Sequence, residues 1–218
     1  MVATPSNPTG TLVERDEMVR IHETVKARGG QLIVDEIYQG LVYGMSGYSA
    51  LELADDIFVI NSFSKYFGMT GWRLGWVVAP EPYVKSLDTL AQNLFLSCAS
   101  MSQYAALQAF SPQSLEVLEQ RRQEFERRRD FLLPALQEIG FEVPVKPQGA
   151  FYLYANSSRL TDDSFSFAYD LLEAQGVAIT PGKDFGIHRP EQHVRFAYTN
   201  SIENMAEGVR RIKEFLAR

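Results

Sequence analysis

The sequence of 218 residues contains little cysteine, histidine or tryptophan, and positive charge is not in excess. A single cysteine, Cys98, excludes an internal disulfide framework and fits a reducing compartment. No apolar run reaches the ~18 residues that a membrane span needs, and the first residues lack a charged-then-apolar signal pattern. The net charge of -6 gives no basic surface for nucleic acid. We therefore expect a soluble, cytoplasmic protein without membrane or nucleic-acid partners.

The first part of the chain alternates helix-like and strand-like segments. Residues 12–28 have a helical pattern that Gly29-Gly30 ends. Three short apolar runs follow, at residues 31–38, 57–64 and 74–80. Runs of this kind, separated by helix or loop lengths, are typical of buried parallel strands, so this part is predicted to be α/β. Ligands of such sheets bind at the carboxyl ends of the strands, where Asp35 and Ser62 fall.

The second part begins with a long helical stretch over residues 82–139, with a break near Ser111-Pro112. After it, the pattern predicts strands at 149–157, 177–182 and 193–200 and helices at 164–176 and 201–218. Ser201 is predicted to cap the last helix, with Asn204 at its third position. We expect three parts: a large-domain portion at 1–110, a long connecting helix at 111–145, and a small α+β domain at 146–218.

Lys65 is the centre of the most informative motif. It follows two hydroxyl residues in Ser62-Phe63-Ser64-Lys65, and Arg73 lies eight residues further on. A lysine amine can hold an aldehyde as an imine, and the forked guanidinium of an arginine binds phosphate. The pair of serines adds hydroxyl groups at the phosphate end. A lysine and an arginine in this arrangement indicate a phosphorylated aldehyde, which points to pyridoxal phosphate.

Asp35 and Tyr38 fit the same cofactor. Asp35 ends a buried apolar run, where a carboxylate is stable only beside a fixed cation such as a protonated pyridine nitrogen. Tyr38, three residues on, offers a phenol to the ring oxygen beside the imine. These two residues, with Lys65 and Arg73, therefore predict a cofactor site.

Other features carry little weight when taken singly. An Asn-Pro-Thr-Gly stretch is usually a turn, and an arginine such as Arg195 is about as often a surface or salt-bridge residue as a ligand. The run RRQEFERRR at 121–129 alternates with glutamate in a helical pattern, which favours a solvated helix face over a binding patch. The three histidines share no metal-ligand spacing, and we assign them no function.

Six motifs, taken together in order and spacing, resemble those of the class I/II aminotransferases, in the fold type I or aspartate aminotransferase superfamily of pyridoxal phosphate enzymes. They are Ser6-Asn7-Pro8-Thr9-Gly10, Asp35-Glu36-Ile37-Tyr38, Ser62-Phe63-Ser64-Lys65 with Gly71-Trp72-Arg73, Gly149-Ala150-Phe151-Tyr152, Pro181-Gly182 and Val194-Arg195-Phe196. The resemblance runs over the whole chain. It implies a partial cofactor-binding large domain, mostly a parallel sheet with helices, followed by a small α+β domain.

The resemblance also implies a role for each cofactor-binding residue. Lys65 is similar to the lysine that holds the cofactor as an aldimine and then moves a proton between the substrate α-carbon and the imine carbon. Asp35 is similar to the residue that keeps the ring nitrogen protonated. Tyr38 and Asn7 resemble the pair that hydrogen-bonds the ring oxygen. At the phosphate end, the matching positions are Ser62, Arg73 and the neighbouring Ser64.

At the substrate end, Arg195 resembles the arginine that binds the α-carboxylate of an amino acid or a 2-oxo acid as a bidentate pair, with Asn7 beside it. The members of the family resembled here are homodimers, so the resemblance implies a homodimer for the whole protein. No metal is expected.

The resemblance begins almost at the first residue, on the Asn-Pro-Thr-Gly motif. About the first half of the family's length, which by resemblance closes the site around the cofactor, is therefore expected to lie outside this sequence. We expect an N-terminally truncated aminotransferase with weak or no turnover alone. Two alternatives remain open, a related pyridoxal phosphate lyase or synthase, and a noncatalytic remnant that serves as a binding or assembly module.

Overall fold

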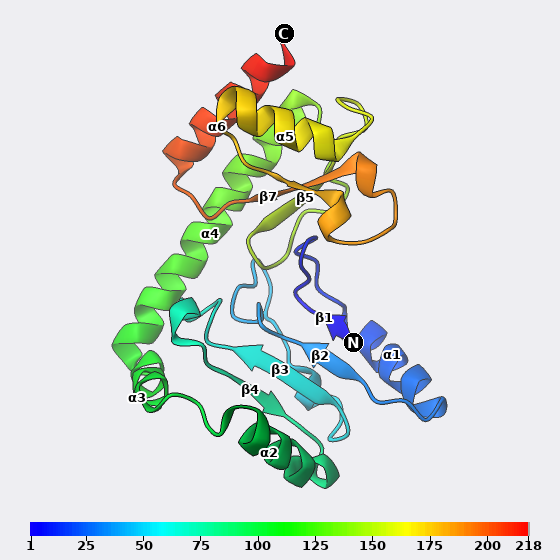
Figure 1. Ribbon diagram of the computed structural model, residues 1–218, viewed down its shortest axis with the longest axis vertical. Helices are drawn as coiled ribbons and strands as arrows, with labels where there is room; N and C mark the ends of the chain where they lie inside the picture. Colours follow the sequence, from blue (N-terminus) through cyan, green and yellow to red (C-terminus); the bar gives the residue numbers. More distant parts are fainter. Residues whose placement is uncertain (218) are drawn as a thin grey trace. The chain divides into compact units, whose positions relative to one another are not determined.

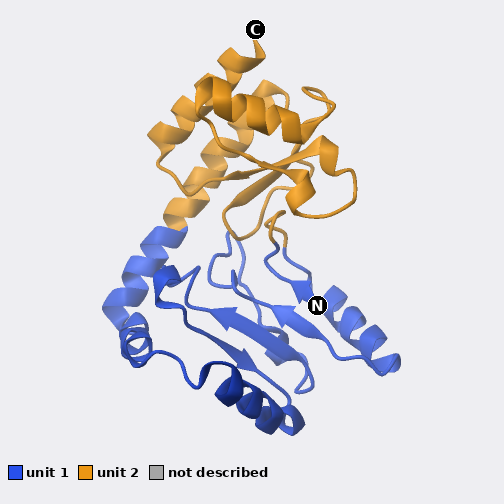
Figure 2. Cartoon of the chain, viewed as in Figure 1, with its two compact units in different colours: residues 1–6, 12–122 blue, residues 7–11, 123–218 orange. Residues whose placement is uncertain are grey.

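The structure is a computed structural model that describes residues 1–217, and it groups the chain into two compact units (Figures 1 and 2). Unit 1 consists of residues 1–6 and 12–122, and unit 2 of residues 7–11 and 123–218. The three-part division at residues 110 and 145 stays a prediction; the helix expected over its middle part is α4 (Pro112–Ile139). Within residues 1–217, no helix is long and apolar enough to span a bilayer.

Unit 1 contains a four-stranded sheet in the order β1 (Val2–Ala3), β2 (Ile33–Asp35), β3 (Phe58–Ser62) and β4 (Gly75–Val78). The β1–β2 and β2–β3 pairs are parallel, which confirms the expected α/β class with a mostly parallel sheet. The prediction of a third parallel strand at 74–80 was wrong, because β4 pairs with β3 in the antiparallel direction. Between them the chain forms only the short 3-10 turn η2 (Thr70–Trp72), so it returns without a helical crossover.

The core of unit 1 lies between this sheet and helix α1 (Arg15–Ala27). Apolar side chains of α1, the strands and the 3-10 turn η1 (Ala50–Glu52) form one buried cluster: Met18, Leu32, Val34, Ala50, Ile57 and Val59. The predicted helix stop is confirmed, since α1 ends at Ala27 and Gly29 follows in the left-handed region at φ 68°. The positions of β2 and β3 are therefore set by buried apolar contacts on α1.

Helices α2 (Glu81–Phe95) and α3 (Ser100–Ala109) follow β4. The helical stretch expected over 82–139 has its predicted break near Ser111-Pro112, because α3 ends at Ala109 and α4 begins at Pro112. It has a second break, which was not predicted, at Leu96 with φ 66°. No glycine or proline marks this second break. All four residues of β4 are exposed, and α2 buries no residue, so the expectation of a buried strand was also wrong here. Exposed apolar surface on this scale marks a place where other polypeptide packs.

Unit 2 contains an antiparallel sheet in the order β5 (Tyr152–Asn156), β7 (His193–Ala197) and β6 (Thr180–Pro181). Helices α5 (Ser164–Gln175) and α6 (Ile202–Leu216) and the second part of α4 belong to the same unit (Figure 1). Two 3-10 turns, η3 (Gly182–Asp184) and η4 (Pro190–Gln192), lie between β6 and β7. The predicted cap is confirmed, because the Ser201 hydroxyl accepts the Asn204 backbone N–H at 3.2 Å.

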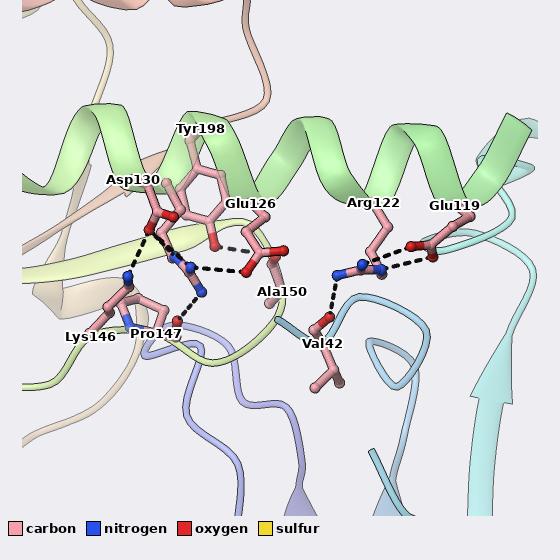
Figure 3. A network of polar contacts seen from close by, with 10 residues as sticks. Val42, Glu119, Arg122, Glu126, Asp130, Lys146, Pro147, Ala150 and Tyr198 are labelled. Atoms are coloured by element: carbon pink, nitrogen blue, oxygen red, sulfur yellow. Dashed lines mark hydrogen bonds and ion pairs between the residues drawn. The ribbon is translucent and has the colours of Figure 1, made fainter. Parts of the chain in front are cut away.

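The arginine-rich run lies on α4, and the prediction of a solvated face holds for only part of it. Arg127 is 73% exposed, as expected. Arg129 is 4% exposed and donates to the Pro147 carbonyl oxygen at 2.9 Å and to Asp130 at 2.9 Å (Figure 3). Within unit 1, Arg122 donates to the Val42 carbonyl oxygen at 2.8 Å. Both arginines thus donate to loop carbonyl oxygens, and a helical charge pattern does not reveal such loops.

Replacing Arg129 with methionine keeps the apolar stem but leaves the buried Pro147 carbonyl without this donor. We expect Arg129→Met to lower the free energy of unfolding by about 1–3 kcal/mol. Arg127→Met, which removes only an exposed pair with Glu124, should cost less than about 0.5 kcal/mol. Urea unfolding followed by circular dichroism measures both, and equal midpoints for the two variants would contradict the structural role of Arg129.

Glu36 is a buried acid directly after β2. Its side chain is 2% exposed, and its carboxylate accepts the Ala50 N–H at 2.7 Å and the Ser49 hydroxyl at 2.9 Å. Burial raises the pKa of Glu36 above its ordinary 4.5, although these two hydrogen bonds act in the opposite direction. Glu36 thus fixes the start of η1 at the cost of some stability at neutral pH.

The raised pKa of Glu36 makes the stability of the fold depend on pH. Between the ordinary and the raised value, the folded chain binds more protons than the unfolded one, so stability falls as pH rises through the raised value. We expect Glu36→Gln, which keeps an oxygen acceptor, to gain stability relative to the parent chain as pH rises from 4.5 to neutral. Urea unfolding at several pH values measures the difference. The exposed Glu23→Gln serves as control, and a parallel pH profile for both variants would exclude the role of Glu36.

Candidate functional site

The order of the strands brings three of the predicted site residues to one edge of the unit 1 sheet. Asp35 ends β2, and Ser62 ends the neighbouring parallel strand β3. Gly75, the first residue of β4, pairs with Ser62, which places the preceding Arg73 near the same end of the sheet. Carboxyl ends of parallel strands are where ligands bind in sheets of this type.

Lys65 and Tyr38 approach this edge from the loops that follow β3 and β2. The Lys65 ammonium nitrogen lies 5.4 Å from the centroid of the Tyr38 ring, a cation–π distance. Tyr38 is buried within a tight turn in which its carbonyl oxygen accepts the Leu41 N–H at 2.8 Å. The half-buried Asp35 uses one carboxylate oxygen to accept the Ile37 N–H at 3.1 Å. Tyr38 and Asp35 are therefore both fixed by the turn after β2.

The loop after β3 is held by its own hydroxyl groups. Ser62 Oγ accepts the Ser64 N–H at 3.0 Å and donates to the Leu74 carbonyl oxygen at 3.3 Å. Thr70 Oγ1 donates to the Ser64 carbonyl oxygen at 2.7 Å. Arg73, in the left-handed region at φ 50°, donates from Nη1 to the Thr70 carbonyl oxygen at 3.0 Å. This contact uses one donor of an exposed guanidinium, so the fork of Arg73 can still bind an anion.

Arg195 is the centre of a second cluster, in unit 2. Its Nη1 donates to Asn7 Oδ1 at 2.8 Å and its Nη2 to Thr180 Oγ1 at 3.4 Å. The Tyr152 and Phe185 ring centroids lie 4.2 and 4.5 Å from Arg195 Cζ. Its Nε is buried without a hydrogen-bond partner. Aromatic contacts and hydrogen bonds thus fix the plane of the Arg195 guanidinium. Within residues 1–217, no carboxylate lies within hydrogen-bonding distance of this guanidinium to balance its charge.

Asn7 reaches Arg195 because the Asn-Pro-Thr-Gly segment is part of unit 2. The Gly10 carbonyl oxygen accepts the N–H groups of Gln148 and Gly149 at 3.0 and 2.9 Å. Gly10 has φ 66°, and a β-carbon added there would lie 2.7 Å from the Gly149 carbonyl oxygen. Only glycine fits this close approach, so two motifs that are far apart in the sequence depend on each other.

The predicted site residues therefore form two groups. Unit 1 contains Asp35, Tyr38, Ser62, Ser64, Lys65 and Arg73, and unit 2 contains Asn7 and Arg195. The cofactor contact expected of Asn7 stays a prediction. Sequence reasoning did not assign Thr180 or Phe185; their nearness to Pro181-Gly182 was the only signal. In residues 1–217, no three His, Cys, Asp or Glu side chains are grouped as metal ligands would be.

Comparison with known proteins shows the family. Residues 1–212 match the family model described as aminotransferase class I and II. The chain is 40% identical over 219 residues to (5-formylfuran-3-yl)methyl phosphate transaminase of Methanocaldococcus jannaschii, covering 99% of this chain and 57% of the relative. It is 38% identical over 218 residues to valine–pyruvate aminotransferase of Mycobacterium tuberculosis, covering 99% and 56%. The crystal structure of an aminotransferase from M. tuberculosis superposes with a TM-score of 0.95 at 37% identity, over 99% of this chain and 57% of that one.

The chain therefore belongs to the class I and II aminotransferase family, and it spans little more than half the length of these relatives. Enzymes of this family use pyridoxal phosphate. The donor set of unit 1 fits that group, because Arg73 offers unused N–H groups for a phosphate, Asp35 a carboxylate for a pyridinium, and Lys65 an amine for an aldehyde.

The close packing of Gly10 against Gly149 can be tested by comparing two glycines with the same backbone conformation. Gly10→Ala must strain φ and also displace the backbone at Gly149. Gly29→Ala, at φ 68°, meets nothing within 4 Å and bears only the left-handed strain of about 1–2 kcal/mol. We expect Gly10→Ala to be the less stable variant by a further ~1–3 kcal/mol in urea unfolding. Equal losses would show that the packing of Gly10 is unimportant.

Proposed function

We propose that this chain carries the cofactor-binding and carboxylate-binding residues of a pyridoxal-phosphate-dependent aminotransferase. The reaction transfers an amino group from an amino acid to a 2-oxo acid. The observation that supports it most directly is the grouping of Lys65 with Asp35, Tyr38 and Arg73 at one edge of the unit 1 sheet, in a chain of this family. The substrate class follows from the family, and the roles of single residues are our proposals.

Lys65 acts at the reacting atoms. Pyridoxal phosphate, when bound, supplies an aldehyde that condenses with amines and a ring that withdraws electrons. The Lys65 amine would hold the aldehyde carbon and, once an amino acid had displaced it, would move the proton from the substrate α-carbon to the former aldehyde carbon. Tyr38 lies beside Lys65, and its aromatic ring holds the Lys65 ammonium group in place.

The other site residues of unit 1 bind the cofactor and orient it. Asp35 keeps a proton on the ring nitrogen, since an opposite charge nearby stabilises the protonated form. Arg73 donates to the phosphate from the fork that it does not use on Thr70. Ser64 offers a hydroxyl donor at the same end, and Ser62 can donate there by turning its O–H away from the Leu74 carbonyl oxygen. The short loop that these serines brace sets the position of Lys65.

Arg195 binds the substrate carboxylate. Its Nε is buried, so a carboxylate reaches Nη1 and Nη2 and accepts two parallel N–H bonds at the end of the guanidinium. Asn7, whose Oδ1 now accepts from Nη1, can turn its amide and donate from Nδ2 to the same carboxylate. The aromatic rings of Tyr152 and Phe185 keep the plane of the guanidinium fixed during this exchange.

We further propose that the whole protein is a homodimer and that this chain alone turns over slowly or not at all. Two observations support this: the chain spans 57% of the M. jannaschii relative, and β4 and α2 present exposed apolar side chains in unit 1. The relatives described above are all named as transaminases or aminotransferases, which gives no support to the lyase, synthase or noncatalytic alternatives. An amino-transfer rate ordinary for an enzyme, measured with this chain alone, would contradict the slow turnover.

The lysine assignment predicts a spectral change. Added pyridoxal phosphate should give an absorbance band of an imine, and borohydride reduction should fix the label on Lys65. Lys65→Ala should lose both signals, whereas Lys85→Ala, on the exposed surface of α2, should keep both. Absorbance spectroscopy and peptide mass analysis measure them. A band that survives in Lys65→Ala, or a label on another lysine, would refute the assignment.

A further inference from the structure

Ser102 is a buried serine of helix α3 that has none of the roles proposed so far. It is 5% exposed, and its Oγ donates to the Trp72 carbonyl oxygen at 2.7 Å. Ala106, one turn further along α3, belongs to a buried apolar cluster with Phe63 and Ala109. A hydroxyl group is costly to bury beside apolar side chains unless it is hydrogen-bonded. The bond from Ser102 to Trp72 meets this need, and it connects α3 to the loop after β3.

This bond holds the peptide group directly before Arg73. Arg73 has φ 50° and ψ 51°, which lies in the left-handed region that residues other than glycine disfavour. On the other side of Arg73, the Leu74 carbonyl oxygen accepts the Phe63 N–H at 3.1 Å. The backbone around Arg73 is thus held by Ser102 of α3 on one side and by the residue after β3 on the other.

The guanidinium of Arg73 depends on this backbone for its position. It is exposed, and within residues 1–217 it makes one hydrogen bond, to the Thr70 carbonyl oxygen at 3.0 Å, and no ion pair. An arginine that loses a contact holding it in the left-handed region returns to the right-handed region, which is lower in energy. Its side chain would then leave the backbone in a different direction and carry the guanidinium elsewhere.

We propose that Ser102 is a positioning residue for Arg73, and that through Arg73 it sets how tightly the site binds a phosphate monoester. The Ser102 hydroxyl holds the peptide group between Trp72 and Arg73 in the orientation from which the arginine fork reaches the phosphate. Ser102 acts through the backbone only, because its hydroxyl donates to Trp72. This role rests on the phosphate contact proposed for Arg73.

The test compares two aldehydes that differ only in the phosphate. Pyridoxal phosphate and pyridoxal are titrated into the full chain, and only the absorbance band that Lys65→Ala loses is counted. The ratio of the two dissociation constants, pyridoxal over pyridoxal phosphate, measures what the phosphate contributes to binding. We expect Ser102→Ala to lower this ratio by about threefold to tenfold, because Arg73 loses its fixed position, and to leave the dissociation constant of pyridoxal unchanged.

Ser100→Ala is the matched control, at an exposed serine of the same helix. It should leave the ratio unchanged. Alanine is the best helix former, so neither substitution disfavours α3, and circular dichroism checks that both variants fold. If Ser102→Ala does not fold, Ser102→Cys replaces it, since a thiol donates only weakly, and an undiminished ratio in that variant would overturn the proposal.

The variant Arg73→Gln tests whether Ser102 acts through the arginine. In that background we expect a low ratio that Ser102→Ala does not lower further, because the two residues act on the phosphate as one unit. If Ser102→Ala lowers the ratio by the same factor with and without Arg73, Ser102 does not act through this arginine and the proposal is wrong.

Two further results would contradict the positioning role alone. One is a ratio that Ser102→Ala leaves undiminished, and the other is an equal weakening of both aldehydes, which indicates a general loosening of unit 1. A failure of the proposed function would look different. The parent chain would then bind pyridoxal phosphate no more tightly than pyridoxal, and the role of Ser102 would be refuted together with the phosphate contact of Arg73.

Discussion

The parallel pairing of β2 with β3 is the constraint on which the candidate site depends. In this register Asp35 lies opposite Ile60, so both strands end at the same edge, and the loops that carry Tyr38 and Lys65 start side by side. The pairing is fixed by apolar contacts of the sheet on α1, in a cluster that includes Met18. Chemistry at the edge thus depends on packing between the strands and a helix that contains no site residue.

Unit 2 holds an arginine in a position to bind an anion. Hydrogen bonds from Arg195 to Asn7 and Thr180 leave its charge unneutralised, and two aromatic rings limit how the side chain can turn. A cation held in this way loses little conformational entropy on binding, which favours affinity for a carboxylate. The contact with Asn7 depends in turn on Gly10, because the turn closes only where a side chain is absent.

The sequence predicted the class of the fold and the order of its elements, because apolar runs and helix caps are local signals. Ser201 at the start of α6 and Gly29 after α1 are examples. It did not predict the antiparallel direction of β4, which depends on how a short loop returns, or the burial of Arg129, which depends on a distant carbonyl. In the site, motif residues were recognisable, whereas Phe185 was not, since its contact with Arg195 is made only by folding.

Strand β4 lies at the end of the unit 1 sheet, and within the described residues its outer edge has no partner strand. Trp76, Val77 and Val78 are exposed along it. During refolding, an uncovered edge of this kind pairs with strands of other molecules. The rate of that pairing depends on protein concentration, whereas the rate at which the unit folds does not. The recovery of native chain is thus a kinetic competition, which dilution shifts toward folding and crowding shifts toward aggregates.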